Sequence, residues 1–324
     1  MRRTTVLGIF GVLAAALWSA AVPAVAETDY PTRPVQIVVP FVAGGNTDLI
    51  TRIMADQFAA AFRQPFTVIS KPGAGANIGA AYVAASEPDG YTLLMGPPGP
   101  LTVNQFLYPS MSFDPERSFA PIALVARIPN VLVAPASSGV RSLRELIDKA
   151  RAHPGMLDYA SAGIGSSGHL SAVLFMALAR IDINHVPYKG TGQSLQDLLA
   201  GRVAMTIDNL GPLLPFIQNG QLIALGVADR EPVSLLPGVA PIGQTVPGFE
   251  TYSWNALMAP AGTPHAIIAK LNAEANRALH KPEVAEKLRS FGSEPAGGSP
   301  QDLANFLAAE RVRWKRAVDI SQGK

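Results

Sequence analysis

Two glycine-rich loops hold the residues in this sequence that are best placed to do chemistry. The first, residues 40–48, reads Pro-Phe-Val-Ala-Gly-Gly-Asn-Thr-Asp, and the second, residues 160–169, reads Ala-Ser-Ala-Gly-Ile-Gly-Ser-Ser-Gly-His. Each follows an apolar run typical of a strand and leads into a segment with the apolar spacing of a helix. The first N–H groups of a helix have no acceptor within it, and the helix dipole is positive there. Such a loop can therefore bind an anion without lysine or arginine.

Hydroxyl and amide side chains at these two helix starts add further hydrogen-bond donors. Asn46 and Thr47 lie in the first loop, and Ser166 and Ser167 lie in the second. In open α/β sheets, ligands bind at the carboxyl ends of the strands, where both loops would lie. Two opposed loops would suit a small carboxylate or dicarboxylate, although glycines of this kind can also serve only to make tight turns.

Asp208 ends the apolar run of residues 203–207, so we expect it at the carboxyl end of another strand. There it could accept a hydrogen bond from an amine or hydroxyl of a ligand. It could equally be a cap or turn residue before residues 209–212. The residue pattern leaves both interpretations open.

The second loop also matches a dinucleotide-binding fingerprint, Gly163-x-Gly165-x-x-Gly168, between a predicted strand and a predicted helix. No acidic residue lies about 20 residues beyond it, the nearest being Asp182. We therefore expect no dinucleotide and no other cofactor.

A serine hydrolase is the enzymatic alternative. The nucleophile motif G-x-S-x-G is nearly matched twice, but Ile164 replaces the first glycine for Ser166, and His169 replaces the last glycine for Ser167. His169 also lies too close to Ser167 along the chain for the usual catalytic base, which comes from a separate loop. We expect no catalysis, with a secreted α/β hydrolase that uses Ser166 or Ser167 as the alternative.

Composition excludes several classes of protein. The 324 residues include 26 Lys and Arg against 24 Asp and Glu, for a net charge of +2. They contain no basic run interleaved with aromatic residues, so we expect no nucleic-acid partner. The lack of cysteine excludes disulfides, thiolate catalysis and cysteine-based metal sites. The remaining histidines have no metal-ligand spacing, so no metal site is expected; they are His153, His185, His265 and His280.

The first 26 residues have the pattern of a secretory signal peptide. Arg2 and Arg3 precede an apolar stretch over residues 6–18, and Ala24-Val25-Ala26 fits the small-x-small rule for cleavage. The apolar stretch is shorter than the ~20 residues that cross a bilayer. Cleavage would remove both surplus arginines and leave 24 basic and 24 acidic residues. We expect a periplasmic protein.

Strand-like and helix-like segments alternate along the rest of the chain, which predicts an α/β fold with mostly parallel sheets. The strand-like runs are almost continuously apolar, as in sheets covered on both faces. Residues 120–135 and the Pro/Gly-rich residues 231–248 indicate two crossings between domains. We expect one domain built from residues 27–126 and 248–324, and a second, inserted domain of residues 127–247.

Eight motifs occur in order along the chain after residue 26. They are residues 30–34 (Tyr-Pro-x-Arg-Pro), the loop 40–48, residues 71–79 (Lys-Pro-Gly-Ala-Gly-x-Asn-Ile-Gly), 88–94 (Pro-Asp-Gly-Tyr-Thr-Leu-Leu), 159–170, 185–190 (His-Val-Pro-Tyr-Lys-Gly), 208–210 (Asp-Asn-Leu) and 259–264 (Ala-Pro-Ala-Gly-Thr-Pro). In order and spacing, this set resembles the Bug-type periplasmic receptors of the tripartite tricarboxylate transporter family. The resemblance covers almost all of the chain after the signal segment.

The resemblance implies a two-domain periplasmic-binding-protein fold of the Venus-flytrap type II class, with a two-segment hinge. It also implies a small organic carboxylate held between the two loops, partly through ordered water, and delivered to integral-membrane transporter subunits. We expect a monomer. The ligand-binding residues implied by motif match are Phe41, Gly44, Gly45, Asn46, Thr47 and Asp48 on one side, Gly165, Ser166, Ser167 and His169 on the other, and Asp208 at the far end of the ligand.

Two departures from the family pattern bear on the ligand. Val42-Ala43 stands where a proline is usual in the first loop, and residues 96–100 read Gly-Pro-Pro-Gly-Pro where small polar residues are common. Proline has no N–H to donate, so that wall of the cleft should be apolar. We therefore expect an aromatic or otherwise partly apolar carboxylate.

Overall fold

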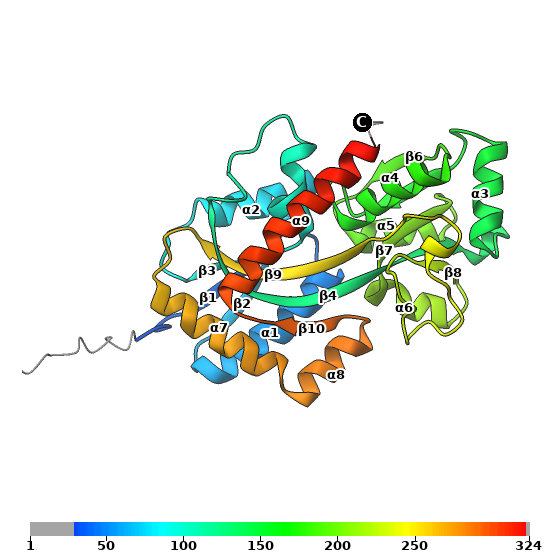
Figure 1. Cartoon of the computed structure of the whole chain (residues 1–324). Helices are drawn as coiled ribbons and strands as arrows, with labels where there is room; N and C mark the ends of the chain where they lie inside the picture. Colours follow the sequence, from blue (N-terminus) through cyan, green and yellow to red (C-terminus); the bar gives the residue numbers. More distant parts are fainter. Residues whose placement is uncertain (1–28, 322–324) are drawn as a thin grey trace, which may run out of the picture.

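The computed structural model describes residues 29–321 and contains two α/β halves that lie side by side (Figure 1). Two long strands, β4 (Phe119–Pro135) and β9 (Tyr252–Pro260), join the halves through the middle of the molecule. The predicted α/β class is confirmed. The predicted signal segment, residues 1–26, lies outside the described residues.

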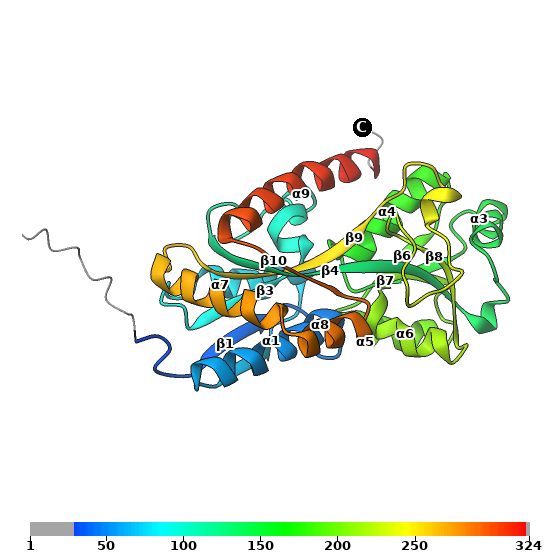
Figure 2. The ribbon, with the colours of Figure 1, turned by 60° about the horizontal axis from the view of Figure 1, so that its bottom comes forward.

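Each half combines a group of parallel strands with helices that cover it, as the alternating sequence pattern predicts. The first half contains β1 (Val35–Val39), α1 (Asn46–Phe62), β2 (Phe66–Ser70), α2 (Asn77–Ala84), β3 (Thr92–Gly96), α7 (His265–Leu279), α8 (Pro282–Ser290) and β10 (Glu294–Gly297). The second half contains α3 (Leu143–Ala152), β5 (Asp158–Ser161), α4 (Ser167–Ala179), β6 (Asn184–Pro187), α5 (Thr191–Leu199), β7 (Met205–Asn209), α6 (Leu210–Gln218) and β8 (Leu222–Val227). The last helix, α9 (Pro300–Ser321), lies along both halves (Figure 2).

The strands form one sheet in the order β2-β1-β3-β9-β4-β7-β5-β6, and β8 and β10 also pair with β4. The outer pairs are parallel: β1 with β2 and β3, and β5 with β6 and β7. The pairs that involve β4 or β9 are antiparallel. The sheet is therefore mixed, which corrects the expectation of mostly parallel sheets. The chain leaves the first half along β4 and returns along β9, so these two strands run in opposite directions.

The two connecting strands cross between the halves next to each other. β4 pairs with β9 as far as Pro129, which lies opposite Tyr252, and from Asn130 it pairs with β7. The N–H of Thr251 donates to the carbonyl of Ala228, which ties the return crossing to the end of β8. Both positions lie close to the expected domain limits near residues 127 and 248. The limits themselves stay a prediction.

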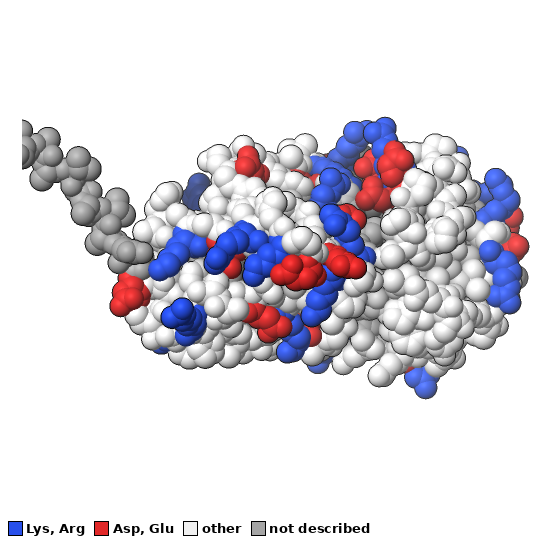
Figure 3. All heavy atoms as spheres, turned by 90° about the horizontal axis from the view of Figure 1, so that it is seen from below, with Lys and Arg blue, Asp and Glu red and all other residues white. Residues whose placement is uncertain are grey.

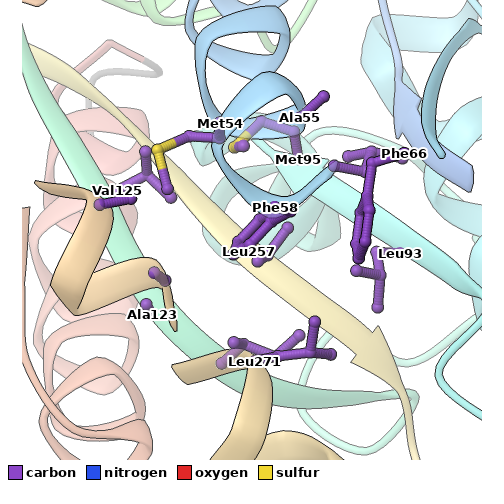
Figure 4. Close-up of a cluster of buried hydrophobic side chains, with 14 of the residues drawn as sticks. Met54, Ala55, Phe58, Phe66, Leu93, Met95, Ala123, Val125, Leu257 and Leu271 are labelled. Atoms are coloured by element: carbon purple, nitrogen blue, oxygen red, sulfur yellow. The ribbon is translucent and has the colours of Figure 1, made fainter. Parts of the chain in front are cut away.

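Each half has its own apolar core. In the first half, Phe58 and Met54 of α1 are fully buried and pack with Leu271 of α7 over the sheet residue Leu257 (Figure 4). In the second half, Phe175 of α4 is fully buried in a separate cluster. Two cores joined by a pair of strands allow each half to move as a rigid unit about the crossing.

A buried carboxylate fixes α9 to the connecting strand β9. Glu310 accepts hydrogen bonds from the Tyr252 hydroxyl at 2.9 Å and from Trp254 Nε1 at 2.7 Å. It also accepts one from Trp314 Nε1 at 3.0 Å. Trp314 in turn packs against Leu170 of α4 in the second half. The last helix therefore links the hinge strand of the first half to the second half.

Charged side chains of both signs are mixed over the face drawn in Figure 3, and much of the second half is nearly free of them there. Residues 209–228, which include α6 and β8, contain no Lys, Arg, Asp or Glu. Within residues 29–321, no helix has both the length and the apolar character that crossing a bilayer requires.

Two glycines at the second position of their helices differ in the space around them, and this difference predicts opposite effects of alanine. A Cβ on Gly168 of α4 would overlap the carbonyl oxygen of Ile207 in β7, whereas a Cβ on Gly192 of α5 would meet only the Ala43 carbonyl oxygen at 3.7 Å. We expect Gly168→Ala to lower the free energy of unfolding by about 2–3 kcal/mol, because helix and strand must move apart. Gly192→Ala should leave it unchanged or raise it by about 0.5–1 kcal/mol. Urea denaturation of both variants measures this, and equal effects would contradict the close packing of α4 on β7.

Candidate functional site

A cavity between the two halves brings the two glycine-rich loops together. Its volume, counted as the space open to the centres of water-sized molecules, is about 30 Å³. Its walls come from the ends of strands and the starts of helices in both halves. The lining residues are Phe41, Gly45, Asn46, Thr47, Asp48, Pro97, Ala162, Ser166, Ser167, Thr191, Asp208, Asn209 and Ser253. We call this the inner cavity.

Most residues expected to contact a ligand lie on the wall of the inner cavity: Phe41, Gly45, Asn46, Thr47, Asp48, Ser166, Ser167 and Asp208. Gly44, Gly165 and His169 do not line it. The proline wall expected from residues 96–100 is represented by Pro97. Thr191 and Ser253 were missed, because nothing in their local sequence indicates a role. Their place on the wall depends on how β6 and β9 pack in the fold.

The first loop presents an uncapped helix start to the inner cavity. α1 begins at Asn46, and its N-cap residue, Gly45, supplies no side-chain acceptor. Asp48 holds the loop from behind, because its Oδ2 accepts the Gly44 N–H at 3.2 Å and the Arg52 Nε–H at 3.0 Å. The other oxygen of this buried carboxylate, Oδ1, has no hydrogen-bond partner among the described residues. The first turn of α1 thus keeps free N–H donors and one free acceptor.

The second loop is built around Ser166 and His169. Ser166 is the N-cap of α4, and its Oγ accepts the His169 N–H at 3.2 Å. The Nδ1 atom of His169 accepts the Gly165 N–H at 3.3 Å, while Gly165 itself has a φ of +85° that favours glycine. His169 therefore fixes the shape of the loop and is not part of the inner cavity wall.

His169 belongs to a half-buried pair of neutral imidazoles. Its ring centroid lies 4.5 Å from that of His185, and His185 Nε2 lies 2.7 Å from the Ser161 hydroxyl oxygen. Burial, with a smaller contribution from His185, lowers the pKa of His169 to about 3. Burial lowers the pKa of His185 to about 4. A neutral His169 can keep its Nδ1 lone pair for the Gly165 N–H, which a protonated ring could not do.

Asp208 closes the inner cavity from the second half, with only 3% of its surface exposed. Its Oδ2 accepts the Thr191 hydroxyl at 2.8 Å, and its Oδ1 accepts the Asn209 N–H at 2.7 Å. Burial raises the pKa of Asp208 to about 6, against the opposing effect of these two hydrogen bonds. Two more helices begin here, because Thr191 starts α5 and Asn209 is the N-cap of α6.

Four helix N-termini, those of α1, α4, α5 and α6, thus surround the inner cavity. Of the described residues that line it, only Asp48 and Asp208 carry charge, and neither lysine nor arginine is present. Backbone N–H groups and helix dipoles are therefore the groups here that can bind an anion. The side-chain oxygens of Asn46 and Asn209 are buried without partners among the described residues, so they can accept hydrogen bonds from water or a ligand.

The two halves are in contact across the mouth of the cleft. The Tyr108 hydroxyl donates to the Ile164 carbonyl oxygen at 3.2 Å. A Cβ on Gly190 would lie 2.6 Å from Cγ2 of Val42, and a Cβ on Gly99 would lie 2.8 Å from the Gly165 carbonyl oxygen. The structure is therefore a closed form, which the sequence could not indicate.

Several solved structures are similar to this chain over nearly its full length. An R. palustris protein, Rpa4515 with adipate, is 39% identical with a TM-score of 0.88, covering 90% of this chain and 98% of its own. MatC (Rpa3494) from Rhodopseudomonas palustris, with bound malate, is 33% identical with a TM-score of 0.86, covering 89% and 100%. The periplasmic binding protein BugD is 29% identical with a TM-score of 0.87, covering 90% and 99%. These similarities confirm the periplasmic-binding-protein fold.

The profile of the tripartite tricarboxylate transporter family receptors matches residues 50–322, most of the chain. The match covers the six ordered motifs from residue 71 onward, and the similarity to BugD agrees with their Bug-type pattern. This chain belongs to the tripartite tricarboxylate transporter family receptors, as a member of the Bug type.

Proposed function

We propose that the protein is a periplasmic receptor that captures a small organic carboxylate between its two halves and delivers it to integral-membrane transporter subunits. The observation that carries this proposal is the inner cavity, where helix starts from opposite halves meet without any cationic side chain. A carboxylate there would accept N–H donors from α1 and α4 together. Adipate and malate, the ligands held by two of the similar structures, are both dicarboxylates, which supports the same ligand class.

Capture works by a shift between open and closed forms. In the open form, the loop that starts α1 and the loop that starts α4 are each exposed to water. A carboxylate that bridges them interacts with both loops only in the closed form, so binding favours closure. The transporter subunits would then receive the closed, loaded receptor. Residues 1–26 would direct the chain to the periplasm and be cleaved there, leaving domains of residues 27–126 with 248–324 and of residues 127–247.

The alternative of a serine hydrolase has little support from the geometry. Among residues 29–321, neither Ser166 nor Ser167 has a hydrogen bond to a histidine ring nitrogen. The Ser166 hydroxyl oxygen instead accepts a backbone N–H as a helix cap. The serine that does lie beside a histidine ring, Ser161, is fully buried. A general base must lie within hydrogen-bond reach of its nucleophile, and Ser166 and Ser167 lack that arrangement.

Asp208 can act in the inner cavity either as a hydrogen-bond acceptor or as a donor, depending on its protonation state. When ionised, it accepts hydrogen bonds and would meet an amine or hydroxyl of the ligand. When protonated, it can also donate to an oxygen of the ligand. With a pKa of about 6, both states are accessible near neutral pH. Asp208 is thus proposed to set how the polar groups of the ligand are oriented, beside the two loops that hold its carboxylate.

A thermal-shift screen of mono-, di- and tricarboxylates, amino acids and aromatic acids tests the proposed function. We expect at least one organic carboxylate, with adipate and malate included in the panel, to raise the melting temperature. The shift should increase with ligand concentration, because a ligand that binds only the folded state stabilises it by mass action. A screen in which no carboxylate binds would overturn the receptor assignment.

Alanine variants of two N-cap serines distinguish an effect on ligand binding from an effect on helix stability. The two serines have equal cap distances. The cap bonds are both 3.2 Å, from the His169 N–H to Ser166 and from the Glu145 N–H to Ser142, which lies outside the inner cavity. Each alanine variant should lose about 1 kcal/mol of unfolding free energy. Only Ser166→Ala should also lower the affinity for the carboxylate found in the screen. We expect a loss of about tenfold or more, because a hydrogen bond to a charged group is lost. Urea denaturation measures the loss of stability, and calorimetric titration of the two variants measures the affinity. Equal affinities would contradict a role of Ser166 in binding the ligand.

The raised pKa of Asp208 makes protein stability depend on pH in a defined direction. Its folded-state pKa of about 6 exceeds the ordinary 3.8, so the folded protein holds this proton more tightly than the unfolded chain. Stability contributed by the protonated carboxyl is therefore lost as the pH rises from about 4 to 6. Asp208→Asn should be more stable than the parent above pH 6, by about 1–3 kcal/mol, and equal to it below pH 4.

Urea denaturation at a series of pH values measures the effect of Asp208→Asn. Asp197 serves as the control, because hydrogen bonds from Tyr188 and Arg202 lower its pKa. Asp197→Asn should therefore give no gain in stability at neutral pH. A difference between Asp208→Asn and the parent that stays constant with pH would show that Asp208 ionises as an ordinary carboxyl.

A further inference from the structure

A second, larger cavity adjoins the inner one at the mouth of the cleft. It shares Phe41 and Ala162 with the inner cavity, so the two lie on either side of these residues. Its volume is about 210 Å³, against about 30 Å³ for the inner cavity on the same measure. We call it the outer cavity. Phe41 is half-buried between the two.

The size of the inner cavity limits what it can hold. A water-sized group needs about 10–15 Å³ of such space, so the inner cavity holds about two of them. That is enough for the two oxygens of a carboxylate and too little for the body of an organic acid. In this closed form, the outer cavity past Phe41 offers room for the rest of a longer ligand.

The outer cavity has walls from both halves. The turn of residues 73–76 and Tyr108 come from the first half, while Pro187, Tyr188 and Lys189 come from the second. All four residues of the turn have positive φ, from 47° to 126°, and this brings the backbone of Gly75 against the Ile164 carbonyl oxygen. A side chain at Gly75 would prevent this contact. The outer cavity therefore takes this shape only when the halves close.

The lining suits an apolar segment. The aromatic rings of Phe41, Tyr108 and Tyr188 contribute to its walls together with Pro187. The hydroxyl groups of both tyrosines are held by protein acceptors, since Tyr188 donates to Asp197 Oδ2 at 2.6 Å and Tyr108 donates to the Ile164 carbonyl. With both hydroxyl groups already paired, the parts of these two side chains that are left to contact a ligand are apolar.

Lys189 is the only charged residue among the described residues that line the outer cavity. Its side chain is exposed, and no carboxylate of residues 29–321 forms an ion pair with it. Both charged residues of the inner cavity are acidic, so the charge on the lining changes from negative to positive along the cleft. An anionic group at the outer end of a ligand would meet Lys189 without competition from a protein carboxylate.

We propose that the outer cavity is a second subsite of the binding cleft, which takes the far end of an elongated dicarboxylate. One carboxylate of this ligand lies in the inner cavity at the helix starts, an aliphatic or aromatic spacer passes Phe41, and the second carboxylate lies near Lys189. This inference rests on the proposed function and narrows its substrate class. The ligand contacts both halves in both cavities, so a longer spacer adds contacts that exist only in the closed form.

The test compares three aliphatic probes of increasing reach, namely succinate, adipate and suberate, with the rigid aromatic diacid terephthalate, by calorimetric titration of the purified protein. We expect affinity to rise from succinate to the longer acids. Lys189→Met should lower the affinities for suberate and terephthalate by about fivefold and leave the affinity for succinate unchanged. Lys71→Met is the matched control, because Lys71 stacks over Tyr82 at 4.0 Å and lines neither cavity. It should change none of the four affinities.

Three outcomes would contradict the proposed second subsite. They are equal effects of Lys189→Met on succinate and suberate, no effect on either, and a loss of affinity with chain length. If the protein binds none of the four probes but binds another carboxylate of the wider screen, the subsite is wrong and the receptor function stands. If no carboxylate of the screen binds, the receptor function itself fails.

Discussion

Backbone N–H groups at the starts of helices need hydrogen-bond acceptors, and the arrangement of the cleft depends on this requirement. Four helices begin at the inner cavity, and among them only α4 has a side-chain cap, Ser166. Removing such donors from water without a partner costs about 1–3 kcal/mol for each group. An anion in the inner cavity, or water that stands in for it, offsets this cost in the closed form. In the proposed receptor, recognition of the ligand and closure of the halves would therefore depend on the same hydrogen bonds.

The helix starts lie in different halves, so their meeting depends on the strands between them. β4 and β9 pair along the middle of the molecule, and at the crossing, where Pro129 lies opposite Tyr252, β4 changes its partner from β9 to β7. Glu310 ties this crossing to α9 through Tyr252, Trp254 and Trp314. A twist at the crossing would move α1 relative to α4 while each core stays intact. In the proposed mechanism, the rigid cores and the paired strands would convert a small change at the hinge into the opening of the cleft.

The chemistry of the cleft changes along its length. The inner cavity offers N–H donors, buried amide oxygens and Asp208, whereas the outer cavity offers aromatic rings and the ammonium group of Lys189. Pro97 lies on the inner wall, where a proline cannot donate a hydrogen bond. A ligand with a compact polar head and an apolar body matches the polar inner cavity and the more apolar outer cavity. The two serines that resemble hydrolase nucleophiles serve here as a helix cap and a cavity wall.

The sequence by itself determined the local structural features. These are the glycine turns that lead into helices, the N-cap at Ser166, the alternation of strands and helices, and the apolar wall at Pro97. These depend on residues a few positions apart, so a short stretch of chain is enough to predict them. Only the tertiary structure decided that the two loops face each other, that Thr191 and Ser253 join the wall, and that His169 is not part of it. It also decided the mixed sheet, because the antiparallel pairing of β4 with β9 joins segments that lie far apart in the chain. Packing between distant segments is set by the whole fold, which no local pattern specifies.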